Sequence, residues 1–521
     1  MLEKRAPKAP DARQLTNEWN LKVYAGVISG LMAFTVRPFP GLPSVGHAIV
    51  VFLYCAINLI FCFTNLEFNK PSNFAARFGW MSTGNIVLAC FLGLKNTPLA
   101  LFASFSYDGL NIFHQLVGYT AVAQMVFHAI CYMKWEDMKN NWGKILEPEN
   151  WEGVAAGFAM VVLMMGFLRR LGYEIFYISH IIGVILTLVF LGLHRPYWVW
   201  KICIASLFAA CIWAIDRAIR AWRLIFNFVD NRATLQALPN GGVKLISSKQ
   251  LAWASPGSHC FVWIPGIRPF ETHPFTIVSN TSSGLELIMK SHSGFTKSAY
   301  NYAVSNPGAS LRVSFDGPYG SFPDLARYDR IVLIAGGSGA TFTFGLAATV
   351  LDSLGPDSTQ FVDFIWAVKT KENLVWFSEQ IAKLKTHASH VSLSLHVTSD
   401  TEGICSDETL VSDTEISPNI VSMAEITEKS DSDESPPSTD EKLQARPAKV
   451  NEMHTAHGVK YEKLRAEAMI GEAIQATKSD GRVLIASCGP ETLMKAVSAA
   501  ATRYMTPDGP SLDIHCESFG W

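Results

Sequence analysis

Long apolar segments separated by short polar connections occupy the first 220 residues, and the pattern changes after that point. Each segment is close to the length that a helix needs to cross the hydrocarbon core of a bilayer, about 20 residues. We therefore expect a lipid-embedded bundle of transmembrane helices within residues 21–217, preceded by a polar tail at residues 1–20. The seven segments are residues 22–37, 47–65, 78–95, 109–133, 152–168, 174–194 and 198–216.

The placement of basic residues predicts the orientation of this bundle. Arg217, Arg220 and Arg223 follow the last segment, and Arg169 and Arg170 lie in the short connection between the fifth and the sixth. Because basic residues concentrate on the cytosolic side of a membrane, the C-terminal half should be cytosolic. Seven spans then place the N-terminus outside. If the short first segment does not cross the membrane, six spans remain and the N-terminus is cytosolic, while the rest of the orientation is unchanged.

The soluble half shows two successive patterns. Short β-branched runs with turn signals between them predict a small antiparallel β-barrel over residues 225–325. From about Arg330, strand-like and helix-like runs alternate, which predicts a doubly wound α/β domain over residues 326–521. Residues 400–450 are rich in Ser, Asp, Glu and Pro, so we expect a disordered acidic insertion that interrupts this last domain.

Composition agrees with a membrane protein that carries a soluble half. The chain has 521 residues, of which 49% are hydrophobic and 17% charged, and its formal net charge is −2. This near-neutral balance predicts no nucleic-acid partner. The ten cysteines show no CxxC spacing, so a reducing cytosolic side without structural disulfides is the simplest interpretation.

Four histidines lie inside two of the apolar segments, and both pairs repeat one interval. His114 and His128 are fourteen positions apart, as are His180 and His194. Fourteen residues make almost four helical turns and rise about 21 Å, so the two members of a pair share one helix face. Two such helices would place His114 beside His180 near the inner side, and His128 beside His194 near the outer side. Each level then offers two imidazoles to one heme, and two b-type hemes would carry electrons across the bilayer.

Histidines inside membrane segments can also be structural, or can bind a metal other than heme iron. A single intramembrane histidine commonly hydrogen-bonds to a neighbouring helix, and only the repetition argues against that here. Imidazole also binds zinc and copper, but no carboxylate or thiol recurs beside the histidines to complete a tetrahedral site. Arg195 follows His194 and could pair with a propionate of an outer heme, or it could be an anchor at the membrane surface.

Two glycine-containing turns in the last domain predict a dinucleotide site. The first follows the strand-like RIVLIA and opens an apolar helix; the second, Cys488 and Gly489 with the next two residues, follows RVLIAS. A glycine turn at a helix N-terminus lets the backbone approach a pyrophosphate, although a plain strand-to-helix loop looks the same in sequence. The residues of the first turn are Gly336, Gly337, Ser338, Gly339, Ala340 and Thr341.

Taken in order, these motifs resemble the fungal ferric-chelate reductases, within the wider group that includes the superoxide-producing NADPH oxidases. The resemblance covers residue 40 to the C-terminus apart from the acidic insertion. It implies FAD in the barrel, NADPH on the doubly wound domain and two b-type hemes in the membrane. The motifs that carry it are the histidine pairs, the run His273, Pro274, Phe275 and Thr276, both glycine turns, and the C-terminal Glu517, Ser518, Phe519, Gly520 and Trp521.

The resemblance also implies roles for single residues. Pro274, Phe275 and Thr276 would lie along the flavin ring. His273 and the turn formed by Gly294, Phe295 and Thr296 would lie near the FAD phosphates. The first glycine turn would hold the NADPH pyrophosphate, and Cys488 and Gly489 would lie beside the nicotinamide. Trp521 would cover the flavin face, or it could anchor the last strand. Lys369 and Lys371 are candidates for the 2′-phosphate contact.

The expected function is transmembrane reduction of extracytosolic ferric or cupric chelates, in support of iron or copper uptake together with metal transporters. An NADPH oxidase that reduces O2 is the alternative, and a transporter or scaffold without catalysis is a third. In the oxidases the second histidine pair is typically one residue closer, so the equal steps here favour the metalloreductase. The plasma membrane is the first expectation for its location and the vacuolar membrane the second.

Overall fold

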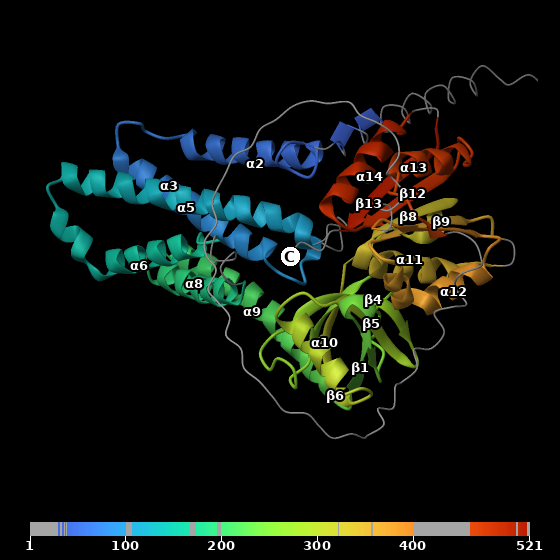
Figure 1. The fold of residues 1–521 in the computed structure, drawn as a ribbon. Coiled ribbons are helices and arrows are strands. Elements are labelled where there is room, and N and C mark those ends of the chain that lie inside the picture. The colour runs from blue at the N-terminus through green and yellow to red at the C-terminus, as the bar shows by residue number, and fades with distance from the viewer. Residues whose placement is uncertain are drawn as a thin grey trace, which may run out of the picture.

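The computed structural model shows a helical bundle joined to two β-sheet domains (Figure 1). It describes a few positions between residues 30 and 37, and then residues 39–99, 107–166, 173–194, 200–320, 322–355, 358–399, 459–506 and 509–517. The predicted insertion at 400–450, Arg195 and Trp521 lie outside the described residues, as does most of the predicted first segment.

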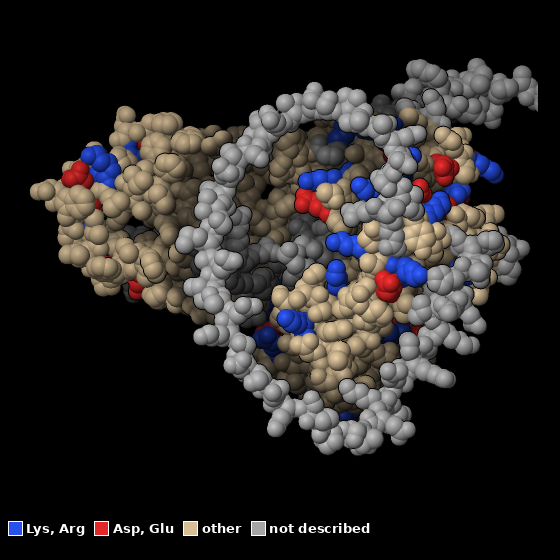
Figure 2. All heavy atoms as spheres, viewed as in Figure 1, with Lys and Arg blue, Asp and Glu red and all other residues tan. Residues whose placement is uncertain are grey.

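Among the described residues, six helices lie side by side in the bundle and correspond to the other six predicted segments (Figure 1). Four of them, α2, α5, α8 and α9, are long and apolar enough to cross a membrane. Charged side chains gather at one end of the bundle and over the soluble half, and the visible face between them is almost uncharged (Figure 2). The helices are α2 (Val45–Phe63), α3 (Pro71–Leu92), α5 (Tyr107–Met138), α6 (Pro148–Leu163), α8 (Tyr173–Leu193) and α9 (Trp200–Phe228).

A buried amide cluster ties three of these helices together. Asn85 of α3 donates hydrogen bonds to Asn58 of α2 and to Gln124 of α5, each at 2.8 Å, and Gln124 donates to Asn58 at 3.1 Å. Tyr54 of α2 donates to Asn85 at 2.8 Å. An amide without a hydrogen-bond partner in hydrocarbon costs free energy. Because these three amides supply one another's hydrogen bonds, they fix how α2, α3 and α5 pack.

The first soluble domain is a seven-stranded antiparallel sheet in the order β6-β1-β2-β5-β4-β3-β7, with α10 (Phe295–Ser305) packed against β1 and β2. Alternate positions such as Val243, Leu245 and Val262 are fully buried and form its core. The strands are β1 (Arg232–Leu238), β2 (Gly242–Ser247), β3 (His259–Trp263), β4 (His273–Thr281), β5 (Gly284–Lys290), β6 (Ser310–Arg312) and β7 (Ser314–Tyr319).

The predicted antiparallel β-barrel is confirmed in part, because the sheet is antiparallel but its strand pairing does not close into a barrel. In the described chain no hydrogen-bond ladder joins the edge strands β6 and β7. These strands are consecutive in sequence, with only Val313 between them, so one passage of the chain pairs first with β1 and then with β3. The two edge strands are therefore joined through Val313 by the chain itself and not by hydrogen bonds to each other.

The second soluble domain is a six-stranded parallel sheet in the order β11-β10-β9-β8-β12-β13. Helices α11 and α12 cover one face, and α13 and α14 cover the other. The strand order reverses between β8 and β12, which is the position where doubly wound folds bind nucleotides. The elements are β8 (Arg330–Gly336), α11 (Ala340–Ser353), β9 (Phe361–Val368), α12 (Ser378–Thr386), β10 (Val391–Val397), β11 (Val459–Lys460), α13 (Ala466–Gln475), β12 (Arg482–Cys488), α14 (Glu491–Arg503) and β13 (Ser511–Glu517).

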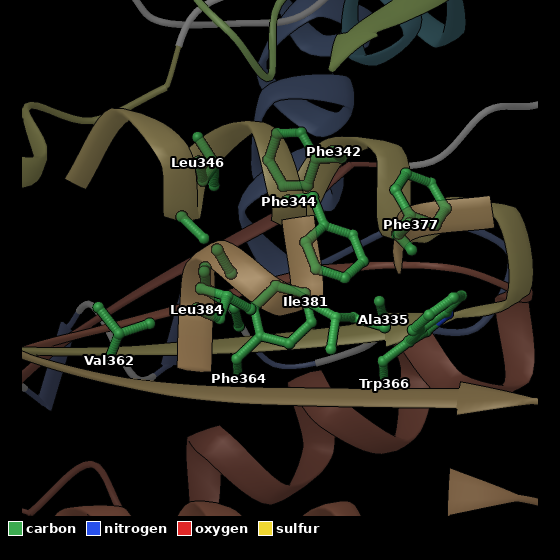
Figure 3. Packing of buried hydrophobic residues seen from close by; sticks show 14 of the residues in the cluster. Ala335, Phe342, Phe344, Leu346, Val362, Phe364, Trp366, Phe377, Ile381 and Leu384 are labelled. Atoms are coloured by element: carbon green, nitrogen blue, oxygen red, sulfur yellow. The ribbon is translucent and has the colours of Figure 1, made fainter. Parts of the chain in front are cut away.

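An aromatic core holds α11 on this sheet (Figure 3). The ring of Phe344 from α11 lies 4.4 Å from that of Phe364 on β9 and 4.6 Å from that of Phe377, measured between centroids. Trp366 of β9 is buried beside them and donates its indole N–H to the Gly337 carbonyl at 2.9 Å. The core therefore also fixes the first glycine turn.

Candidate functional site

The structure brings the four intramembrane histidines together in the predicted pairs. The ring centroids of His114 and His180 are 6.1 Å apart, and those of His128 and His194 are 6.0 Å apart. The rings of each pair are steeply inclined, at 65° and 78°. The two pairs therefore form two separate levels along α5 and α8.

Hydrogen bonds to backbone carbonyls orient three of these rings. Nδ1 of His114 lies 2.9 Å from the Ala89 carbonyl, Nδ1 of His128 lies 2.7 Å from that of Ala75, and Nδ1 of His194 lies 2.5 Å from that of Glu149. A carbonyl only accepts, so Nδ1 carries the proton and Nε2 keeps its lone pair for a metal.

His180 is oriented differently. Its Nδ1 is buried and has no hydrogen-bond partner of ordinary geometry in the described part of the chain. The ring instead lies against Phe176, one turn earlier on α8, with 5.4 Å between centroids. Contact with the Phe176 ring therefore helps to hold this fourth imidazole.

The pair geometry fits a metal with two imidazole ligands. Imidazole nitrogen binds first-row metals at about 2.0–2.1 Å, so two rings on opposite sides of one ion have centroids about 6 Å apart. Among the described residues no group of three or more His, Cys, Asp or Glu side chains could hold a metal ion, so zinc or copper would lack further protein ligands. Heme iron needs only two axial ligands from the protein, because the porphyrin supplies the others.

Glycines on the facing helices give the histidine rings their space. A Cβ on Gly79 of α3 would lie 2.9 Å from Nδ1 of His128, and one on Gly153 of α6 would lie 2.6 Å from Nδ1 of His194. A Cβ on Gly93, the residue that caps the end of α3, would lie 3.4 Å from Cε1 of His114, which is an ordinary van der Waals contact. Gly79 and Gly93 are also fourteen positions apart, so the sequence held this signal, but it was not recognised there.

We expect the substitution Gly79→Ala to impair the outer pair. The new methyl group would push the His128 ring away from the Ala75 carbonyl, and overpacking of this kind costs about 1–3 kcal/mol. Heme content per protein, measured by absorbance, should fall. Gly84→Ala on the same helix is the matched control, because nothing lies within 4 Å of its Cβ position. Equal heme content in both variants would show that Gly79 has no such role.

The predicted flavin residues lie together on β4 and at the start of α10. His273 stacks on Phe295 with 4.5 Å between ring centroids, and Phe275 lies 6.0 Å from the same ring. Gly294 has a φ of +57° and caps α10 without a side-chain hydrogen bond, which leaves the first amides of this helix available to an anion. Pro274 follows His273 in β4, and Thr296 follows Phe295 in α10.

His259 is a residue that the sequence analysis missed. It lies on β3 directly opposite Thr276 of β4. Burial lowers the pKa of His259 to about 4; the charge of Glu517 opposes this effect and that of Lys95 adds to it. His259 is therefore neutral at physiological pH.

This lowered pKa predicts a loss of stability on acidification. As the pH falls from 6.5 toward 4, the unfolded chain binds a proton that the folded His259 does not, so folding stability falls across that window. The limiting slope is about 1.4 kcal/mol per pH unit. The temperature of FAD release should therefore fall between pH 7 and pH 5 by more in the native protein than in His259→Gln. The same decrease in both proteins would contradict this assignment.

The two glycine turns meet at the switch point of the parallel sheet. Gly337 has a φ of +57°, and a Cβ on Gly336 would lie 2.7 Å from Cδ of Pro490. A Cβ on Gly339 would overlap the Cys488 carbonyl and lie 2.9 Å from the amide nitrogen of Gly489. The backbones of both turns therefore approach as closely as glycine allows, at the carboxyl ends of β8 and β12.

The remaining predicted residues also lie at this edge. Ala340 and Thr341 are buried in the first turn of α11, and Thr341 donates to the carbonyl of Ser338 at 3.0 Å. Cys488 is buried, and burial raises the pKa of its thiol, so the thiol stays protonated. Lys369 is exposed just beyond β9, the neighbour of β8.

A helical bundle with two histidine pairs, an antiparallel sheet and a doubly wound sheet define a class of membrane-bound proteins with FAD- and NAD-type domains. The chain belongs to the ferric reductase family. Three family models match consecutive parts of it: the ferric reductase like transmembrane component at residues 78–191, the FAD-binding domain at 227–322 and the ferric reductase NAD binding domain at 328–502.

Curated relatives are fungal. Ferric reductase transmembrane component 6 of Saccharomyces cerevisiae is 28% identical over 70% of this chain and 55% of its own length. Ferric/cupric reductase transmembrane component 1 of Candida albicans is 26% identical over 62% of this chain and 43% of its own. The chain thus spans about half the length of these relatives. A ferredoxin NADP+ reductase from Neisseria gonorrhoeae with bound FAD and NADP superposes at a TM-score of 0.34, with 12% identity, over 55% of this chain and 97% of that one.

Proposed function

We propose that the protein is a transmembrane metalloreductase that moves electrons from cytosolic NADPH, through FAD and two b-type hemes, to extracytosolic ferric or cupric chelates. The observation that carries this proposal is the pair of matched histidine levels, with centroid distances of 6.1 and 6.0 Å, in a bundle whose last helix, α9, is followed by the two sheet domains. The names of the fungal relatives support ferric and cupric acceptors.

Each part of the chain has a distinct task in this scheme. When bound, FAD takes two electrons from NADPH as hydride and releases them singly to heme. Gly336 to Thr341 and the turn at Cys488 hold the dinucleotide at the strand ends. Phe275 and Thr276 orient the flavin on β4, while His273 and the start of α10 hold its phosphates. The inner histidines, His114 and His180, and the outer histidines, His128 and His194, hold the two hemes.

Reduction of O2 is the alternative function, and it is not favoured. Both histidine pairs keep the step of fourteen residues, and the fungal relatives are named as ferric or cupric reductases. The physiological setting is proposed on the same basis: a multi-pass protein of the plasma membrane, with the vacuolar membrane as the alternative, that supplies reduced metal to iron or copper transporters.

The experiment that tests this function is anaerobic. Purified protein loaded with FAD and heme is given NADPH and a ferric chelate, and the ferrous product is trapped by a colorimetric ligand. Rapid NADPH oxidation with ferrous iron formed in the absence of oxygen is the expected result. Iron reduction that requires air and stops with superoxide dismutase would identify an oxidase that reduces iron indirectly.

A further inference from the structure

A fully buried carboxylate lies where the flavin-type sheet meets the bundle. Asp316 of β7 has no exposed surface, and its Oδ2 accepts a hydrogen bond from Nε of Arg220 on α9 at 2.5 Å. Oδ1 accepts from the Tyr319 hydroxyl at 2.7 Å and lies 3.7 Å from the guanidinium of Arg223, one turn further along α9. Two arginines of the last bundle helix thus converge on one strand of the sheet.

The same arginines reach the connection between α3 and α5. Arg223 donates to the side-chain oxygen of Asn96 at 2.7 Å and to the Tyr319 hydroxyl at 3.2 Å. The backbone and side-chain N–H groups of Asn96 both donate to Asp216 of α9 at 2.8 Å. Asn96 lies seven residues beyond Ala89, whose carbonyl lies 2.9 Å from Nδ1 of His114. Continuous hydrogen bonds therefore link β7 to the end of α3 that lies beside the inner histidine pair.

The other side of the cluster reaches the flavin residues. Phe261 of β3 lies opposite Asp316, and its ring lies 4.9 Å from the Arg220 guanidinium and 5.0 Å from Nζ of Lys95. Two residues earlier on β3, His259 lies opposite Thr276, the residue proposed to face the flavin ring. The cluster therefore lies between the flavin residues and the inner histidines.

Stability alone does not account for such a cluster. Removing the Asp316 carboxylate and the largely buried Arg220 guanidinium from water costs free energy that their attraction offsets only with good geometry. Replacing such an ion pair by well-packed apolar residues is often neutral or stabilising. What a buried ion pair does provide is a single, directional arrangement of the elements that it joins.

We propose that Asp316, Arg220, Arg223 and Asn96 form a clamp that fixes the distance between the flavin and the inner heme, and so sets the rate at which electrons pass between them. The inference rests on the proposed function. The step concerned takes one electron from reduced FAD and converts ferric inner heme to ferrous heme, so the hydride of each NADPH supports two such transfers. In this proposal the four residues act by position, because electron transfer falls steeply with distance.

The test compares two ion-paired aspartates in the full, cofactor-loaded protein. Asp363 of β9 is the matched control, because it pairs with Arg330 at 2.5 Å and lies away from the bundle, although its side chain is 13% exposed and that of Asp316 is fully buried. Stopped-flow absorbance follows FAD reduction by NADPH and heme reduction by FAD separately. In Asp316→Asn we expect heme reduction to slow by about tenfold or more, as for other small misplacements of reacting groups. FAD reduction and the KM for NADPH should not change, and Asp363→Asn should change neither step.

Hydrogen exchange adds a readout that does not depend on turnover. Amides of residues 93–99 and 314–319 should exchange faster in Asp316→Asn and keep their rate in Asp363→Asn. Arg223→Gln is a milder variant, and it should slow heme reduction in the same sense even where Asp316→Asn fails to retain FAD.

The outcomes separate the clamp from the function on which it rests. Native protein whose heme is never reduced by NADPH would refute the proposed function. Native heme reduction that persists at full rate in Asp316→Asn and Arg223→Gln would overturn the clamp alone. Equal slowing of FAD and heme reduction in Arg223→Gln would also overturn it, because the effect would then be general.

Discussion

Replacement of His128 or His194 by Ala should abolish reduction of the external acceptor, while FAD reduction by NADPH persists. Each level brings together two imidazoles of the described residues, about 6 Å apart, so the loss of one would remove half of the protein ligands that we propose for that heme. Removing a hydrogen-bond partner of a metal ligand typically lowers metal affinity or activity by about 10–100-fold. Removing the ligand itself should therefore lower activity by more than that. Trapped ferrous iron under anaerobic conditions measures the effect, and the absorbance of bound heme should fall in parallel.

His47→Ala is the control for this experiment. His47 is a histidine of the bundle that belongs to neither pair; it lies on α2 and stacks on Phe113 with 5.7 Å between centroids. This variant should keep its heme content and its rate. Metal reduction that continues unchanged in His128→Ala and His194→Ala would refute electron transfer through both histidine levels. Loss of FAD reduction together with metal reduction would indicate a folding defect.

The second large effect is expected at the nucleotide site. In Gly339→Ala the new Cβ would overlap the carbonyl of Cys488 and lie 2.5 Å from its carbonyl carbon, and both are backbone atoms that no side-chain rotation can move. The two turns must separate, and the nicotinamide would then lie away from the flavin. FAD reduction by NADPH should fall by about 100-fold, the cost of a displacement near 1 Å at a reacting centre.

Two measurements make this prediction specific. Gly339→Ala should retain its heme spectrum and should still reduce a ferric chelate when dithionite replaces NADPH, because the bundle is untouched. Gly355→Ala is the control in the same domain, since nothing lies within 4 Å of its Cβ position. Normal NADPH oxidation by Gly339→Ala would mean that the close contact of the two turns is not needed for the nucleotide.

The features that could be predicted from sequence are those set by spacing or position over a short stretch of the chain. The histidine pairs follow from a fourteen-residue step on helices, and the glycine turns follow from their position between a strand and a helix. The matching glycines of α3 were missed because only the packing of α3 on α5 shows that Gly79 faces His128. The pattern of short strands predicted the antiparallel sheet but could not show how its edges end, since β6 and β7 pair with two distant strands, β1 and β3.

The last helix of the bundle extends beyond the apolar segment predicted from sequence. That segment was placed at residues 198–216, and α9 continues past it to Phe228. The helix continues because Asp216 is bonded to Asn96 and because Arg220 and Arg223 reach Asp316. These partners lie about one hundred residues away in sequence, so no local pattern could reveal them.

The two histidine levels along α5 and α8 have an electrical consequence. In the proposed function each electron that leaves the inner level for the outer one carries negative charge across most of the membrane. Moving one elementary charge through the whole membrane potential is worth about 2.3 kcal/mol per 100 mV. An inside-negative voltage would therefore drive turnover, and turnover would in time dissipate that voltage unless a cation followed each electron outward. Metal reduction by the protein in sealed vesicles should accordingly depend on the voltage across them.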